Sequence, residues 1–340
     1  MDFLIIRLSS LGDIIHTLPA FSALRKKFPE SRISWIVEQK GQDILELVPG
    51  IDQIHVLPVT KWQLSRKHFW QILSRFKKKI SGKDQVALDF QGLVKSAFIS
   101  YLSHAKRRIG FHRQNLREPL ASFFYTDHLE EIPETNHVVQ KNLALLHLLG
   151  IQEDGFDFPL HIPDELCDSV LSKLKQTGYT NDKKLVLLNV GAAWETKRWF
   201  PDRWIRTARM IQKADSFLLL LWGNEKEKSL ASYISRNVHI PISPFLNLKE
   251  VIALIKRAHL LISGDTFALQ AACALSIPVV GIFGPTSPQR NGPFLPADRV
   301  AFHPIKCSYC YKRKCSKLEC LDKISSEEVT DLVFKRLKSS

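Results

Sequence analysis

Short runs of consecutive hydrophobic residues alternate along the chain with longer amphipathic stretches. In the first half, such runs occupy 3–8 (FLIIRL), 32–38 (RISWIVE) and 85–90 (QVALDF), and a segment with helical spacing follows each of them. Strands that are hydrophobic throughout, without alternation, are typical of parallel sheets buried under helices on both faces. The pattern therefore predicts an α/β chain with helices connecting parallel strands.

The same rhythm restarts after a more polar stretch, 151–182, that is rich in prolines and acidic residues. New hydrophobic runs end at or just before a glycine at 184–190, 217–223, 259–264 and 278–284. We predict two doubly wound, Rossmann-like domains, 1–165 and 166–322. A last helix within 323–340, which begins with a Ser325/Glu328 capping box, could pack back across both. Ligands of open parallel sheets bind beyond the carboxyl ends of the strands, so we expect the two domains to face a cleft.

Composition and charge narrow the class of protein. The chain has 340 residues, 45% hydrophobic and 24% charged, which is ordinary for a globular protein. No run approaches the roughly 18 apolar residues of a membrane span, and the N-terminus lacks a secretory pattern, so we expect a cytoplasmic protein. The net charge is +14, which favours an anionic partner. No nucleic-acid-binding motif accompanies it, so we expect no nucleic acid.

The positive charge is concentrated in the first half of the chain. Residues 61–83 contain eight Lys or Arg, and residues 95–117 contain six, with no acidic residue in either stretch. One interpretation is a solvated helix face. The other is a docking surface for an acidic substrate or for the inner leaflet of a membrane.

Two loops of the first half carry candidate chemistry. In 7–20 (RLSSLGDIIHTLPA), a turn with Ser9, Ser10 and Gly12 follows a buried strand, and Asp13 stands where a helix begins. The helix dipole and free backbone N–H groups keep such a carboxylate ionised. It is either an ordinary helix-start residue or a general base. In 89–97 (DFQGLVKSA), a glycine after a strand allows the backbone to approach a ligand.

Two loops of the second half point to an anionic ligand. In 191–200 (GAAWETKRWF), small residues precede Lys197, whose ammonium suits a phosphate, although a surface-loop lysine is the alternative. In 263–294, Asp265 and Thr266 stand between a strand and a helix. They form either an anion-binding helix start or a plain N-cap pair. The glycine loop 283–288 (FGPTSP) would lie beside them.

Four cysteines cluster near the C-terminus. Cys307, Cys310, Cys315 and Cys320 are spaced C-x2-C-x4-C-x4-C. In a cytoplasmic protein this clustering indicates a metal more than disulfides, and four thiolates suit a structural zinc. The alternative is a set of reduced cysteines that tighten a loop.

Taken together, 7–20, 89–97, 192–199, 264–266 and 283–294 resemble, in order and spacing, the heptosyltransferases of glycosyltransferase family 9. These enzymes transfer heptose from ADP-heptose during assembly of the lipopolysaccharide core. Residues 117–125 (REPLASFFY) and 137–142 (HVVQKN) are most similar to heptosyltransferase I, which adds the first heptose to a Kdo residue of Kdo-lipid A. The resemblance implies a GT-B fold and an inverting, metal-independent reaction that requires no cofactor.

The resemblance also implies roles for individual residues. Asp13 matches the catalytic aspartate and Lys197 the lysine at the donor phosphates. The donor side would comprise Ala192, Ala193, Lys197, Glu227, Asp265, Thr266, Phe267 and Gln270. The acceptor side would comprise Ser9, Ser10, Gly12, Lys61, Gln91, Gly92, Lys95, Arg113 and Arg117. Because the acceptor is a lipid, the basic residues Lys61, Arg66, Lys67, Arg107, Arg108, Arg113 and Arg117 and the aromatic residues Trp62 and Phe69 are candidate contacts of the inner membrane's cytoplasmic face.

The chain departs from the family pattern at one motif. The family reads D-T-G-x-x-H, whereas Phe267 and Gln270 stand here in place of the glycine and the histidine. Gln270 can donate a hydrogen bond but cannot carry charge. This leaves open a related transferase with another donor or acceptor, such as heptosyltransferase II or III, or a weakened sugar-nucleotide-binding protein.

Overall fold

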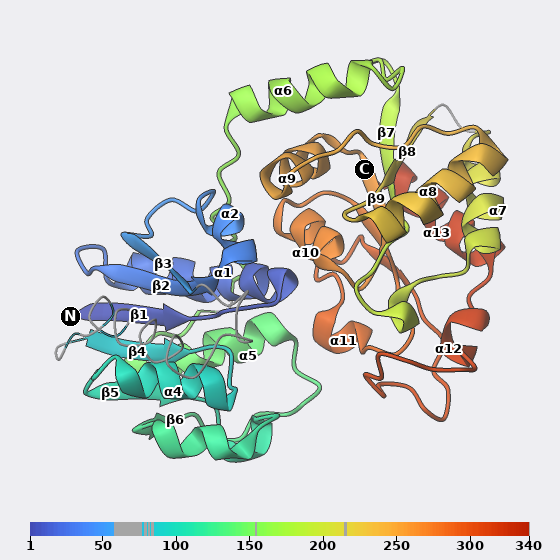
Figure 1. Ribbon diagram of the computed structural model, residues 1–340. Helices are drawn as coiled ribbons and strands as arrows, with labels where there is room; N and C mark the ends of the chain where they lie inside the picture. The colour runs from blue at the N-terminus through green and yellow to red at the C-terminus, as the bar shows by residue number, and fades with distance from the viewer. Residues whose placement is uncertain are drawn as a thin grey trace, which may run out of the picture. The chain divides into compact units, whose positions relative to one another are not determined.

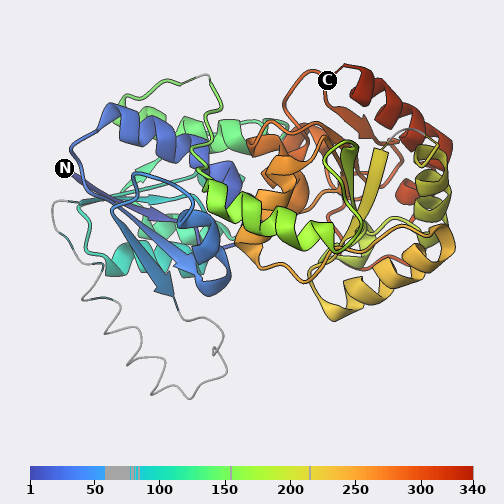
Figure 2. The same cartoon turned by 90° about the horizontal axis from the view of Figure 1, so that it is seen from above.

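The computed structural model describes residues 1–57, 77, 80, 82, 85–153, 155–213 and 216–339. The chain divides into two compact units, Met1–His161 and Ile162–Ser340. Each is a parallel sheet with helices on both of its faces (Figures 1 and 2). The predicted boundary after residue 165 falls inside helix α6 (Asp164–Lys175), near the start of the second unit. The predicted contact residues Lys61, Trp62, Arg66, Lys67 and Phe69 lie outside the described residues.

The sheet of the first unit has six parallel strands. Their order is β3 (Gln53–Leu57), β2 (Ile33–Glu38), β1 (Asp2–Ile6), β4 (Gln85–Asp89), β5 (Arg107–Gly110) and β6 (Asp127–His128). The connecting helices are α1 (Leu11–Lys27), η1 (Gln39–Gly41), α2 (Gln42–Leu45), α4 (Val94–Leu102), η3 (Arg113–Asn115), η4 (Pro119–Phe124), α5 (Val138–Leu145) and η5 (Leu146–Leu149).

Neighbouring residues of β2 show why these strands are hydrophobic throughout. Trp35 packs toward Phe21 of α1, with ring centroids 6.1 Å apart, whereas Ile36 shares a core with Ile99 of α4. Successive side chains of a strand point to opposite faces, so both faces of this sheet are buried.

The sheet of the second unit has five parallel strands. Their order is β11 (Arg299–Ala301), β10 (Val279–Ile282), β9 (Leu260–Gly264), β7 (Lys184–Asn189) and β8 (Ser216–Leu221). The helices after α6 are η6 (Glu195–Lys197), α7 (Pro201–Ile211), α8 (Glu225–Val238), α9 (Leu248–Arg257), α10 (Phe267–Ala274), α11 (Pro288–Asn291), α12 (Glu319–Asp322) and α13 (Ser326–Lys338). The three-residue strand β11 was not predicted from the sequence, because so short a run has no periodicity to read.

The last helix, α13, belongs to the core of the second unit. Ser325 caps it by accepting a hydrogen bond from the Glu328 backbone N–H at 3.0 Å. The reciprocal half of the predicted capping box is not formed, because the Glu328 carboxylate contacts His303 Nε2 at 2.8 Å instead. α13 packs on α7, β10 and β11. The Arg336 guanidinium, 6% exposed, pairs at 2.9 Å with the fully buried carboxylate of Asp298. These contacts attach the C-terminus to the second sheet.

The strand orders locate one crevice in each unit. In open parallel sheets, ligands bind where the order reverses, because the helices that follow the two central strands leave toward opposite faces. The reversal lies between β1 and β4 in the first sheet and between β7 and β9 in the second. The loops 7–13 and 89–92 therefore meet in one unit, and the loops 190–197 and 265–266 meet in the other. None of the helices in the described part of the chain is long and apolar enough to span a bilayer.

Candidate functional site

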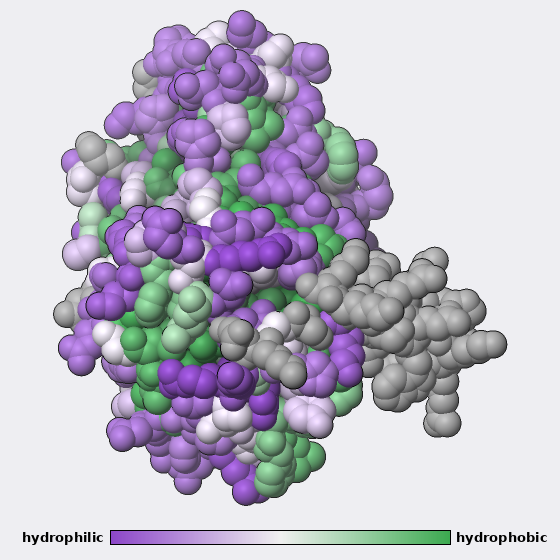
Figure 3. Space-filling view, turned by 90° about the vertical axis from the view of Figure 1, so that its left-hand side faces the viewer, coloured by the Kyte–Doolittle hydropathy of each residue, from purple (hydrophilic) through white to green (hydrophobic). Residues whose placement is uncertain are grey.

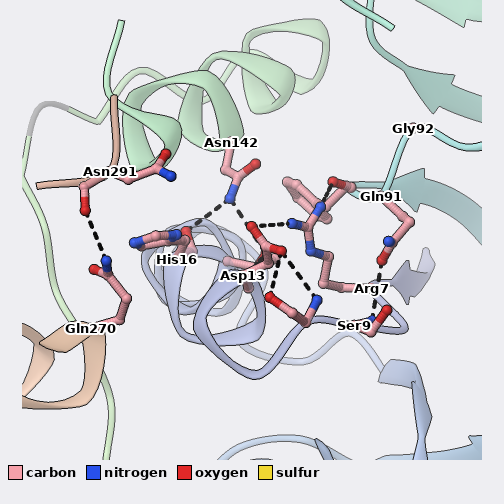
Figure 4. Close-up of polar contacts among 12 residues, drawn as sticks. Arg7, Ser9, Asp13, His16, Gln91, Gly92, Asn142, Gln270 and Asn291 are labelled. Atoms are coloured by element: carbon pink, nitrogen blue, oxygen red, sulfur yellow. Dashed lines mark hydrogen bonds and ion pairs between the residues drawn. The ribbon is translucent and has the colours of Figure 1, made fainter. Parts of the chain in front are cut away.

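Asp13 lies in the first turn of α1, in the turn that follows β1 (Figure 4). One carboxylate oxygen pairs with the Arg7 guanidinium at 2.8 Å. The other accepts hydrogen bonds from the backbone N–H of Ser10 at 3.1 Å and from its hydroxyl at 2.8 Å. Arg7 is 8% exposed, whereas the Asp13 side chain is 37% exposed. The carboxylate is thus fixed from the protein side and open to an incoming hydroxyl.

The surroundings of Asp13 keep its carboxylate ionised. Burial raises the pKa of this carboxyl, but the charges of Arg7 and His16 and the hydrogen bonds from Ser10 together lower the pKa to about 2, from an ordinary 3.8. Opposite charge and hydrogen bonds to the charged form both act in this direction. At neutral pH the Asp13 carboxylate is therefore ionised.

A fully buried carboxylate, that of Asp89, shapes the turn after β4. It accepts hydrogen bonds from the backbone N–H groups of Gln91 at 2.9 Å and Gly92 at 3.2 Å. The hydroxyls of Ser96 and Tyr125 donate to it at 2.8 and 2.7 Å. Burial raises the pKa of Asp89, and these four donors lower it only in part. Gly92 has φ +67°, and a Cβ added there would lie 2.8 Å from Leu116, so this turn requires glycine.

Side-chain hydrogen bonds connect the turn after β1 to the turn after β4 (Figure 4). The Gln91 side-chain oxygen accepts hydrogen bonds from the backbone N–H groups of Leu8 at 3.1 Å and Ser9 at 3.2 Å. Arg7, besides pairing with Asp13, donates to the Phe90 carbonyl. Residues 83 positions apart in sequence thereby fix the position of the carboxylate.

Five of the predicted acceptor-side residues lie in the two connected turns, and the other described ones lie outside them. Ser9, Ser10 and Gly12 lie in the Asp13 turn, and Gln91 and Gly92 lie in the turn beside it. The Lys95 ammonium pairs with Glu38 of β2 at 2.7 Å. Arg113 and Arg117 are exposed, and the Arg113 guanidinium lies over the Phe123 ring. Asn142 of α5 supports α1 by donating to the His16 carbonyl at 2.9 Å.

In the second unit, Lys197 and Asp265 lie in the crevice where the strand order reverses, between β7 and β9. The Lys197 ammonium contacts the Asp265 carboxylate at 2.7 Å and the Asp265 carbonyl at 3.0 Å. It also lies 4.4 Å from the centroid of the Trp194 ring. The two side chains are 15% and 7% exposed. This is a mostly desolvated cation at the N-terminus of α10, where an anionic ligand is stabilised.

A hydrogen-bonded frame surrounds this ion pair. Asn189, the last residue of β7, donates to the hydroxyls of Ser263 and Thr266, each at 2.9 Å. Gln270 is 3% exposed and donates to the Asn291 carbonyl at 2.8 Å (Figure 4). The Asn291 amide in turn donates to Asp265 at 3.3 Å. Gln270 thus fixes the C-terminal end of α11, where Asn291 is the last residue.

Glu227 lies at the carboxyl ends of β7 and β8. Its carboxylate accepts a hydrogen bond from the Gly223 N–H at 2.8 Å. A Cβ added at Gly191 would lie 2.5 Å from the Glu227 carboxylate carbon. The two glycines therefore make room for this carboxylate. Of the remaining predicted donor-side residues, Ala192 accepts a hydrogen bond from Arg198 at 2.8 Å, Ala193 is exposed, and Phe267 is the first residue of α10.

The four clustered cysteines of the second unit are reduced, and three of them lie at its surface. Cys307, Cys310 and Cys315 are exposed, and Cys320 is buried. Within the described residues, no three His, Cys, Asp or Glu side chains are arranged to hold a metal ion. The structure therefore does not bring the four thiols together as ligands.

Sequence reasoning missed several residues of both crevices. Arg7 and Asp89 each stand at the end of a hydrophobic run, where a charged residue is a usable signal. Tyr125, Asn189 and Asn291 carry no local signal, because their importance depends on which strands and loops are neighbours.

Comparison with known proteins agrees with the fold. The model of glycosyltransferase family 9 (heptosyltransferase) matches residues 73–321. Lipopolysaccharide heptosyltransferase 1 of Pseudomonas aeruginosa is 27% identical over 323 residues, covering 93% of this chain and 88% of its own length. The Campylobacter coli protein of the same name is 30% identical over 308 residues, covering 86% of each chain.

Among solved structures, E. coli heptosyltransferase WaaC with ADP superposes with a TM-score of 0.80, at 22% identity, over 99% of this chain and 100% of that one. This similarity confirms the GT-B fold that the sequence predicts. The chain belongs to glycosyltransferase family 9 and is a heptosyltransferase-type glycosyltransferase.

Proposed function

We propose that this protein transfers heptose from ADP-heptose to a Kdo residue of Kdo-lipid A, in assembly of the lipopolysaccharide inner core. A hydroxyl of the acceptor attacks the anomeric carbon of heptose, the bond from that carbon to the ADP oxygen breaks, and the configuration inverts. The observation that carries the proposal is the fixed, partly open carboxylate of Asp13 at the switch point of the first sheet.

Asp13 takes the proton of the acceptor hydroxyl. A carboxylate with a pKa of about 2 is a weak base, so the proton moves late, after the bond to ADP has lengthened and positive charge has developed on the sugar. General base assistance of this kind contributes about 10²–10⁴-fold to the rate. Arg7 and Ser10 keep the carboxylate ionised and in one orientation while the acceptor binds.

Lys197 and the N-terminus of α10 stabilise the departing diphosphate. The ammonium now shared with Asp265 would turn toward the more highly charged diphosphate, and the backbone N–H groups behind Thr266 would add to it. Losing one preorganised group of this kind costs on the order of 3 kcal/mol in the transition state. These groups of the chain itself supply the positive charge, so we propose a reaction without a metal or other cofactor.

Gln270, which replaces the family's histidine, still supports the residues of the donor side. Its amide holds the end of α11 at Asn291, a role that needs no charge. We therefore favour an active transferase over a weakened sugar-nucleotide-binding protein. A donor or acceptor as in heptosyltransferases II and III is the second candidate, and the mass of the product distinguishes them.

The test combines transfer and binding. In Asp13→Asn, transfer from ADP-heptose to Kdo-lipid A should fall by about 10²–10⁴-fold, while calorimetric affinity for ADP-heptose stays that of the wild type. Asp43→Asn is the matched control, because Asp43 also lies in the first turn of a helix, α2. An Asp13→Asn variant with near-normal turnover would contradict the assignment.

We also propose that Cys307, Cys310, Cys315 and Cys320 hold a structural Zn²⁺. The donor set is what tetrahedral zinc prefers, and binding would require the exposed thiols to close over Cys320. The zinc would act on the stability of the second unit. Metal analysis of protein purified without added zinc should find one equivalent in the wild type and none in Cys310→Ser; zinc-free wild-type protein would refute the proposal.

We place the reaction at the cytoplasmic face of the inner membrane, since the proposed acceptor is a lipid of that leaflet.

A further inference from the structure

The first unit leaves a group of large hydrophobic side chains exposed on α4 and η4. Tyr101 is 51% exposed, Leu120 62% and Phe123 72%. Leu120 and Phe123 are three residues apart in the 3-10 helix η4, so their side chains lie on the same side of it. We call Tyr101, Leu120 and Phe123 the apolar patch.

The apolar patch stands on a rigid base. The other side of η4 faces inward: Ala121 is fully buried, and the Phe124 ring lies 5.8 Å from Phe98 and 6.0 Å from Tyr101. Leu120 and Phe123 therefore point to solvent from a helix whose opposite side is packed against the protein. Exposed, contiguous hydrophobic groups of this kind mark interaction surfaces.

Cationic side chains surround the apolar patch. The Arg108 guanidinium lies 5.8 Å from the Tyr101 ring centroid, and that of Arg113 lies 5.8 Å from the Phe123 ring centroid. Lys106 and Arg117 are exposed on the adjoining segments. Among the acids close by in sequence, Glu118 accepts a hydrogen bond from the Val94 N–H at the start of α4, and Asp127 pairs with Arg107. The rim thus carries a net positive charge.

This combination fits one partner in particular. Aromatic and aliphatic side chains enter the boundary between headgroups and acyl chains, while Arg and Lys around them pair with anionic headgroups. Figure 3 shows hydrophobic groups set among hydrophilic ones on one face of the molecule.

We propose that the apolar patch and its basic rim dock on the surface of an anionic lipid bilayer, with Leu120 and Phe123 inserted at the interface. The proposal rests on the proposed function in one respect, that the acceptor is a lipid. Docking here would bring the acceptor close to its site, because Leu116, on the segment leading into η4, packs against Gly92 of the turn beside Asp13.

The test is co-sedimentation of the full chain with vesicles of phosphatidylglycerol and phosphatidylethanolamine. Leu120→Ser/Phe123→Ser should weaken binding by at least about tenfold, equivalent to about 1.4 kcal/mol. The control is Phe245→Ser, which removes a side chain of similar exposure, 70%, from the second unit. Binding of the wild type should also weaken on pure phosphatidylcholine and in high salt. Unchanged thermal unfolding will establish that both variants fold.

Equal vesicle binding by the wild type and the double variant would overturn the proposal. So would a wild type that ignores vesicles but forms dimers that the double variant cannot form, since the patch would then be a contact between two copies of the chain. A transfer assay separates this result from the proposed function. The double variant should match the wild type on a deacylated, soluble acceptor and fall behind on acceptor embedded in vesicles. If neither protein transfers heptose, the proposed function fails while the vesicle result stands.

Discussion

Replacing Arg7 tests how the protein sets the charge and orientation of Asp13. Arg7 is buried, pairs with the Asp13 carboxylate at 2.8 Å and donates to the Phe90 carbonyl of the neighbouring turn. Arg7→Met preserves much of the volume and removes both interactions. Arg7→Lys is the matched control, because it keeps the charge but cannot reach both partners with one planar group.

The size of the effect follows from the pKa of Asp13. The change from 3.8 to about 2 corresponds to about 2.4 kcal/mol. Because the Asp13 side chain is 37% exposed, solvent screening reduces the ion pair's share to roughly 1 kcal/mol. The lost hydrogen bond to Phe90 adds about 1 kcal/mol. Arg7→Met should therefore lower the free energy of unfolding by about 2 kcal/mol at neutral pH.

The sign of the pH dependence is fixed by the direction of the shift. The pKa of Asp13 is lower in the folded than in the unfolded state, so its contribution is present above about pH 4 and disappears as the pH falls toward 2. Without Arg7, burial opposes the charge of Asp13 with less compensation, so the pKa of this carboxyl should rise toward its ordinary value of 3.8.

The assay is kcat/KM for transfer between about pH 3.5 and 8, with urea denaturation at the same pH values. In the wild type, kcat/KM should not fall through Asp13 protonation in this range. In Arg7→Met, kcat/KM should fall at the acidic end of the range, and in Arg7→Lys this fall should be much smaller. If the pH profiles of kcat/KM for the wild type and Arg7→Met superimpose, the reasoning is refuted, even if Arg7→Met is less stable. A purely structural role of Arg7 would lower stability without changing the pH profile.

Three further predictions address the rest of the molecule. Lys197→Met should lower kcat/KM for ADP-heptose by about 10²-fold, while the KM for the acceptor stays unchanged. Arg336→Met leaves Asp298 buried without its partner and should cost about 3–5 kcal/mol in chemical denaturation; a loss below 1 kcal/mol would show that α13 does not depend on the pair. Tyr125→Phe removes a hydrogen-bond donor to the buried Asp89 carboxylate and should lower the free energy of unfolding in urea denaturation by about 1–3 kcal/mol.

Much of the fold could be predicted because short stretches of sequence determine where the strands and helices begin and end. The hydrophobic runs that became β1, β7 and β9 are continuous, and glycines or helix-start residues follow them. The same local signals identified Asp13, Lys197 and Asp265 as candidates, since a residue just after a buried strand must lie at the carboxyl edge of its sheet.

The sequence alone could not predict which groups pair. The contact of Arg7 with the Phe90 turn exists because β1 and β4 are neighbours, and no linear pattern specifies that order. Lys95 illustrates the same point: it stands at a loop that favours a ligand, but the strand order also places Glu38 within 2.7 Å. The pairing of Lys197 with Asp265 likewise depends on β7 lying beside β9.

The most direct test of the central claim is a transfer reaction with the wild-type protein, ADP-heptose and Kdo-lipid A, read by mass spectrometry of the lipid. The proposal predicts a product heavier by one heptosyl residue, formed with release of ADP and absent with Asp13→Asn. Folded protein that binds ADP-heptose and leaves the mass of Kdo-lipid A unchanged would contradict it.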